Sequence, residues 1–169
     1  ALGIDGAIAD GNDTMGYNLT LTALGGNALA TIQDAVANEN GGNGLSLNLE
    51  GNGGVASAWL EDAVATGNDG NGINVAENFN GSAQAYVGGE QLVSARNVAN
   101  GVRLVMSGLS GAPILDFGGG GDSLGQSSFY GNGNRDFRYN NGGGATVMAE
   151  NNWWGVVAPV AGQFAGSID

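Results

Sequence analysis

The acidic side chains are the groups in this sequence best placed to do chemistry, and three of them recur at one position of a repeated unit. Asp34, Asp62 and Glu90 occupy the corner between the second and third segments of successive units, and Asp122 follows in a longer corner. If the units stack at the strand spacing of about 4.8 Å, these acids form a column of like charge. Such a column is unfavourable unless it faces water or binds a hard cation. The pattern therefore allows a solvated column or a calcium site at Asp34, Asp62 and Glu90.

Paired carboxylates are also the one arrangement here that could catalyse acid–base chemistry. The chain has no histidine and no cysteine, which excludes Ser-His-Asp and Cys-His catalysis and the usual zinc sites. Glycoside hydrolysis needs two carboxyls roughly 5 to 10 Å apart in a cleft. Asp116 with Asp122, and Glu61 with Asp62, are the candidate pairs, but solvated corner charges have the same pattern. We therefore expect a protein that is not an enzyme and holds no cofactor other than possible calcium.

The net charge limits the classes of molecule that this protein can bind. The sequence has sixteen acidic residues, four arginines and no lysine, which gives a net charge of −12. Such a chain repels phosphate backbones and anionic membrane surfaces, and no apolar run approaches the length of a membrane span. We expect no nucleic-acid partner and no membrane insertion. The basic residues are Arg96, Arg103, Arg135 and Arg138.

The elements that must position these groups form a repeat. Each unit opens with a short alternating segment, and the steps between segments are 26, 28, 29 and 35 residues. Self-similarity at such a period marks a stacked architecture in which one unit cannot bury its apolar face alone. Three short strands and Gly/Asn corners per unit predict the coil of a parallel β-helix. The segments begin at Leu19, Leu45, Ile73, Val102 and Phe137.

Strand alternation predicts which side chains face the interior. Leu45, Leu47 and Leu49 should be buried, while Ser46 and Asn48 point outward. Residues 28–37 fit helical spacing as well as strands, so a leucine-rich-repeat-like horseshoe is the alternative fold. The Leu-x-x-Leu-x-Leu-x-x-Asn frame of that class is missing.

The C-terminal third carries a resemblance. The string Ala149-Glu150-Asn151-Asn152-Trp153-Trp154-Gly155, with residues 129–132 and 137–141 before it, resembles the last coils of bacterial right-handed parallel β-helix repeat proteins. The resemblance implies an all-β, right-handed single-chain β-helix of about five coils. That class includes surface adhesins, polysaccharide-acting enzymes and structural proteins, so the likeness indicates fold rather than function.

The repeat also divides the chain. We predict an N-terminal cap or assembly segment at residues 1–18, a β-helix at 19–155 and a C-terminal cap or assembly segment at 156–169. Trp153 and Trp154 are expected to plug the final coil. Sugar stacking is the alternative role for both, as it is for Trp59. Ala1 in place of Met fits a mature secreted chain after removal of a signal peptide, and a piece excised from a longer chain would look the same.

Three functions remain open. Apolar terminal segments beside open β edges favour a secreted, non-enzymatic subunit whose copies join head to tail into an extracellular filament or surface layer. The alternative is an adhesin or carbohydrate-binding module of a larger surface protein, with surface carbohydrate as its partner. A polysaccharide lyase or hydrolase is the third. Sequons make Asn12, Asn18 and Asn80 glycosylation candidates in such a secreted protein.

Overall fold

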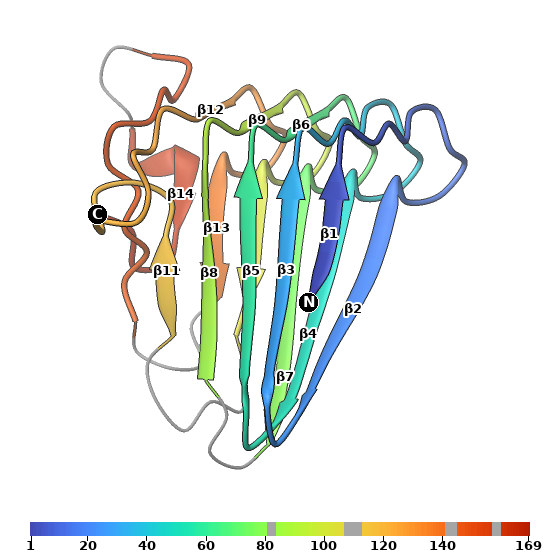
Figure 1. Cartoon of the computed structure of the whole chain (residues 1–169). Coiled ribbons are helices and arrows are strands. Elements are labelled where there is room, and N and C mark those ends of the chain that lie inside the picture. The colour runs from blue at the N-terminus through green and yellow to red at the C-terminus, as the bar shows by residue number, and fades with distance from the viewer. Residues whose placement is uncertain (81–83, 107–112, 141–144, 157–159) are drawn as a thin grey trace.

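The protein is a right-handed parallel β-helix, seen in a computed structural model that describes residues 1–80, 84–106, 113–140, 145–156 and 160–169. The chain runs along a first sheet, crosses a narrow second sheet and returns along a third (Figure 1), and every strand pairs in parallel with the next coil. The first sheet contains β1 (Leu2–Asp5), β3 (Asn27–Gln33), β5 (Val55–Glu61), β8 (Gln84–Glu90) and β11 (Ile114–Asp116). The second contains β6 (Val64–Thr66), β9 (Val93–Ala95) and β12 (Ser128–Tyr130). The third contains β2 (Tyr17–Leu24), β4 (Leu45–Asn52), β7 (Ile73–Asn80), β10 (Val102–Val105), β13 (Phe137–Asn140) and β14 (Phe164–Ala165).

One strand from each sheet makes a coil, and we number the coils 1 to 5 from the N-terminus. In coils 1 and 2 the second sheet is reduced to single bridges, which join Ile8 to Val36 and Val36 to Val64. The chain after residue 145 adds part of a further coil, with a short 3-10 turn at Ala161–Gln163 before β14. The described residues contain no α-helix, so the horseshoe alternative is wrong and residues 28–37 are strand β3 and the bridge at Val36.

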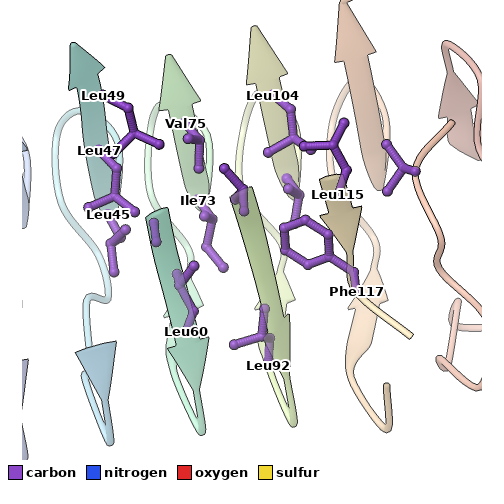
Figure 2. Packing of buried hydrophobic residues seen from close by; sticks show 14 of the residues in the cluster. Leu45, Leu47, Leu49, Leu60, Ile73, Val75, Leu92, Leu104, Leu115 and Phe117 are labelled. Atoms are coloured by element: carbon purple, nitrogen blue, oxygen red, sulfur yellow. The ribbon is translucent and has the colours of Figure 1, made fainter. Parts of the chain in front are cut away.

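The interior is filled by the inward half of each strand. Leu45, Leu47 and Leu49 are 2%, 1% and 0% exposed, as predicted, and Asn48 is partly exposed between them. Ser46 was expected to point to solvent but is only 9% exposed, and its Oγ accepts a hydrogen bond from Asn74 of the next coil at 3.3 Å. Successive coils place these side chains directly above one another, as Leu47 over Val75, and Figure 2 shows the resulting apolar columns facing each other across the interior. Parallel stacking of like residues therefore builds one continuous core.

The register corrects the predicted boundaries at both ends. Leu45 pairs with Tyr17, and Leu19 pairs with Leu47, so the first strand starts two residues earlier than its alternating Leu-Thr-Leu segment indicated. Residues 1–18 are not a segment outside the repeat, because β1 pairs with β3 over its whole length. Residues 160–169, the described part of the predicted C-terminal segment, also continue the β-helix, since β14 pairs with β13. Short strands with small residues hid these pairings from a search for apolar alternation.

A ladder of asparagine side chains runs along one corner of the β-helix. Asn68 donates from its backbone N and from Nδ2 to Oδ1 of Asn97, at 3.0 and 2.9 Å, and its own Oδ1 accepts the same two bonds from Asn40. Asn12 and Asn132 are the end rungs. Amide groups bonded in series satisfy buried backbone and side-chain groups at once. Their spacings of 28, 28, 29 and 35 residues are a signal in the sequence that the search for apolar repeats passed over.

Candidate functional site

The N-terminal face of coil 1 is the first surface where the structure leaves strand edges unpaired. In the described chain β1 pairs only with β3, and β2 only with β4. Parallel strands direct alternate residues to opposite neighbours. Because Tyr17 N donates to Gly44 O, at 2.8 Å, the N–H groups of Asn18, Thr20 and Thr22 point away from coil 2. We call this face, with β1, Ile8 and β2 at its rim, the open end.

Apolar side chains are exposed at the open end. Ile8 is 73% and Leu24 is 81% exposed. The interior residue Leu19 is half-buried, whereas Leu47, its partner one coil further in, is 1% exposed. Soluble repeat proteins cover a terminal coil with a polar cap, and monomers protect strand edges with charges or proline. The described residues provide no such cap over coil 1.

The asparagine ladder also ends at this face. Asn12 donates from Nδ2 to Asn40 Oδ1 at 2.8 Å, as each inner rung does to the next. In the inner rungs, Oδ1 accepts two N–H groups from the rung before it. By the repeat of the ladder, Asn12 Oδ1 is the acceptor for a rung that would precede coil 1.

The C-terminal end is covered more completely. Trp154 is 7% exposed and packs between Phe129 and Phe164, with ring centroids at 5.2 and 4.7 Å. Trp153, by contrast, is 49% exposed. A shallow hollow of about 150 Å³ remains, lined by Trp154, Phe164, Ile168 and Asp169. Of the two tryptophans, Trp154 therefore lies over the last coil as a plug, and Trp153 projects toward solvent.

Charge is distributed unevenly between the two ends. Residues 1–80, which form coils 1 to 3, hold ten of the sixteen acids and none of the four arginines. The remaining chain holds all four arginines and the other six acids. The N-terminal half, which includes the open end, therefore carries most of the net negative charge.

The predicted acidic column forms only in part. Asp34 and Asp62 share a corner position with positive φ angles of 50° and 51°, and the next residue in that position is Gln91, at 56°. Glu90 instead pairs with Glu61 in the neighbouring column. The offset arises because the step from β5 to β8 is 29 residues, one more than the step from β3 to β5.

Glu61 and Glu90, which pair in the neighbouring column, each accept a hydrogen bond within the chain. Glu61 Oε2 accepts from Gln33 Nε2 at 2.7 Å, and Glu90 Oε2 accepts from Leu124 N at 2.9 Å. Across the described ranges, no three Asp or Glu side chains are grouped so that they could hold a metal ion. A calcium site at Asp34, Asp62 and Glu90 would require side chains that the register separates.

Asp116 has a structural role. It is 1% exposed, and its carboxylate accepts four backbone N–H groups of the loop that follows it, those of Gly118, Gly120, Asp122 and Ser123, at 3.1 to 3.2 Å. This loop holds the seven extra residues of coil 5, because β8 to β11 is a step of 28 residues while β9 to β12 is a step of 35. Asp122 accepts a hydrogen bond from Tyr86 at 2.9 Å. The geometry gives the Asp116 and Asp122 pair no support as an acid–base couple.

The sequon asparagines lie in three different settings. Asn12 uses Nδ2, the atom to which a glycan attaches, in the ladder. Asn18 is exposed on the outer face of β2. Asn80 ends β7, and its side chain lies outside the described part. Glycosylation stays a prediction. Of the two described sites, Asn18 is the better candidate, because it is exposed and the ladder does not use its Nδ2.

Trp59 lies on the outer face of the first sheet. Its indole covers Gly88, where an added Cβ would come within 2.5 Å of the ring, and it stacks with Tyr86 at a centroid distance of 6.3 Å. Burial and the hydrogen bond to Asp122 raise the pKa of Tyr86 above its ordinary value. The result is a flat, half-exposed aromatic pair.

No family model, curated protein or solved structure matches this chain. Among the residues that the structure describes, no helix is long and apolar enough to span a membrane. The geometry of the two ends and of the outer faces is therefore the basis for assigning a function.

Proposed function

We propose that this protein is a non-enzymatic, secreted structural subunit whose copies stack head to tail into an extracellular filament or surface layer. The observation that supports this proposal is the edge formed by β1 and β2, which have no further strand partner among the described residues and border an interior where Leu19 is half-buried. A heterologous contact that does not close generates a filament, and strand addition at a free edge supplies main-chain hydrogen bonds.

A second copy of the chain is the occupant that fits this face. The C-terminal end offers β14 as a parallel edge for β2, and the hollow at Trp154, Phe164 and Ile168 as a seat for exposed apolar side chains such as Ile8. The less acidic half, which carries all four arginines, then lies next to the acidic half of the neighbouring copy. Such an interface should bury on the order of 1,000 Å² or more in total.

Secretion and a surface location are supported by the Asn151-Asn152-Trp153-Trp154-Gly155 block, which resembles the end of bacterial surface β-helix proteins. The fold without α-helices in its described part agrees with that class. The absence of cysteine and histidine favours a structural role over a catalytic one.

The test is the substitution Ile8→Asp, with Val98→Asp as a matched control. Both residues are apolar, β-branched and exposed, at 73% and 63%, but Val98 lies on a corner of coil 4, away from both ends. We expect sedimentation and electron microscopy to show concentration-dependent rods for wild type and Val98→Asp, and monomers for Ile8→Asp. Wild-type chains that stay monomeric at high concentration would overturn the proposal.

Thr20→Pro gives an independent check on the strand edge. The substitution removes an N–H that points to the open side, and proline is tolerated on an edge strand with that orientation. It should therefore block stacking while the circular dichroism spectrum stays β-rich. Deleting residues 1–11 would be a poorer test, because it removes β1 from the first sheet.

An adhesin or carbohydrate-binding module is the second candidate, favoured by the Trp59 and Tyr86 pair. A flat aromatic face with polar neighbours suits the apolar face of a neutral sugar ring. If this function is correct, Trp59→Ala should abolish binding on an array of neutral glycans, and Trp153→Ala should leave it unchanged.

A further inference from the structure

A hollow lies on the outer side of the third sheet, near its C-terminal end. Its volume is about 410 Å³, within the range of small-molecule sites. Arg135, Arg138, Asn100 and Asn140 contribute to its lining. It is separate from the open end and from the aromatic pair on the first sheet.

Three of the four arginines gather at or beside this hollow. Arg103 on β10 and Arg138 on β13 are directly opposite each other in the parallel register, and Arg135 precedes β13. Like charges in facing positions are destabilising. In a chain with sixteen acids, an arginine could readily pair with a carboxylate, yet the hydrogen bonds of these three guanidinium groups within the described residues go to amide and carbonyl oxygens. The cluster indicates a binding role.

Neutral groups hold the guanidinium groups in place. Arg138 donates from Nε to Asn140 Oδ1 at 3.0 Å, and Arg103 donates from Nη1 to Asn74 Oδ1 at 2.8 Å. Arg135 donates from Nη1 to the carbonyl of Asn134 at 2.8 Å. Each guanidinium has five N–H donors, so these bonds orient the groups and leave their charge and most donors for a ligand.

A second feature of the hollow is an unsatisfied acceptor. Asn100 is 3% exposed, and its backbone N and Nδ2 both donate to Asn71 Oδ1. Asn43, Asn71 and Asn100 form a second asparagine ladder. It ends at Asn100 because Arg135 occupies the equivalent position in the next coil, as the hydrogen bond from Gly101 N to Arg135 O shows. Asn100 Oδ1 is buried without a hydrogen-bond partner in the described part of the chain. A buried acceptor left without a donor destabilises the fold, so a ligand that supplies a donor is stabilising there.

We infer that this hollow binds an acidic sugar, which carries a carboxylate for Arg138 and Arg135 and a hydroxyl donor for Asn100 Oδ1. A guanidinium fork matches a carboxylate with two parallel hydrogen bonds. A neutral sugar supplies the hydroxyl alone, and a simple carboxylate supplies the charge alone. The ligand that satisfies both the arginines and the amide oxygen has the two groups on one ring.

The probes are sodium glucuronate, glucose and acetate, titrated into ¹⁵N-labelled full-length protein at low ionic strength. We expect glucuronate to bind at least 10-fold more tightly than glucose or acetate, with shifts at the Arg138 and Asn100 signals. Equal affinity for acetate and glucuronate would overturn the hydroxyl assignment, and absence of glucuronate binding would overturn the site.

Arg138→Gln should weaken glucuronate binding at least 10-fold, and Arg96→Gln should leave it unchanged, because Arg96 occupies an exposed corner position outside this cluster. Circular dichroism checks that both variants are folded. If Arg138→Gln instead abolished self-association while wild type failed to bind glucuronate, the arginines would serve the acidic half of a second copy, and the sugar site would be refuted. This outcome is separate from the Ile8→Asp result, which tests stacking alone.

Discussion

At the scale of single residues, Glu77 has the least ordinary environment. It sits at an inward position of β7, opposite Leu49, and is 3% exposed. Burial raises the pKa of its carboxyl to about 8. The pKa of Tyr139 is raised by burial and, to a smaller extent, by the charge of Glu77. A carboxyl in the core therefore makes stability depend on pH in a direction opposite to that of a salt-bridged acid.

The sign follows from proton counting. Between pH 4.5 and about 8 the folded state keeps the Glu77 proton and the unfolded state releases it, so the free energy of unfolding falls as pH rises, by up to about 1.4 kcal/mol per unit. We expect Glu77→Gln to flatten this slope and to be more stable than wild type at pH 8 in urea titrations. Glu50→Gln, on the outer face of β4, should keep the wild-type slope. Identical slopes for wild type and Glu77→Gln would contradict the assignment.

At the scale of elements, the asparagine ladder fixes the corner between the second and third sheets. Asn68 is fully buried and links three coils. Asn68→Ala should therefore lower the free energy of unfolding by about 3 kcal/mol or more, because several buried groups lose partners together. Asn12→Ala, at the open end, removes a rung with a partner on one side only and should lower it by about 1 kcal/mol. Equal losses in thermal or urea unfolding would show that the ladder is not cooperative.

The strands were more predictable from the sequence than the corners. Leu45, Ile73, Val102 and Phe137 are in register as their apolar alternation indicated, because inward and outward positions differ sharply in polarity. Coil 1 was misplaced by two residues, since Tyr17 and Asn18 do not stand out from the polar residues before them. Glu90 was assigned to a corner position one residue away from its true one. The chain has one more residue between β7 and β8 than between β4 and β5, and only the strand pairing reveals it.

The candidate sites depended on contacts that a linear pattern does not contain. The arginine cluster joins Arg103 and Arg138, which are 35 residues apart in the sequence and adjacent in the sheet. The unsatisfied Asn100 oxygen becomes apparent only when the ladder's next rung is known to be Arg135. Trp154 differs from Trp153 through strand geometry alone, since adjacent residues face opposite sides.

At the scale of the whole molecule, the uneven charge predicts one favoured orientation for the proposed stacking of copies. Head-to-head contact would oppose two acidic open ends, and would place two ladder acceptors against each other. Because the chain has no cysteine, pyrene can be attached at Thr14→Cys near the open end and at Gly162→Cys, which occupies the same corner position in the last coil and has room for a side chain. We expect excimer emission when the two labelled proteins are mixed and none from Thr14→Cys alone. Excimers from Thr14→Cys alone would indicate head-to-head pairing.

The loop around Asp116 shows how this architecture tolerates extra length. Seven added residues leave the strands on either side, β11 and β12, in parallel register with their neighbours, because the addition is confined to one corner and closed on a single carboxylate. A corner of this kind is a suitable site for inserting a peptide. A foreign peptide grafted between Gly120 and Asp122, whose N–H groups the Asp116 carboxylate holds, would be displayed once per molecule on the outside of the coil, and the proposed filament would repeat it at regular intervals.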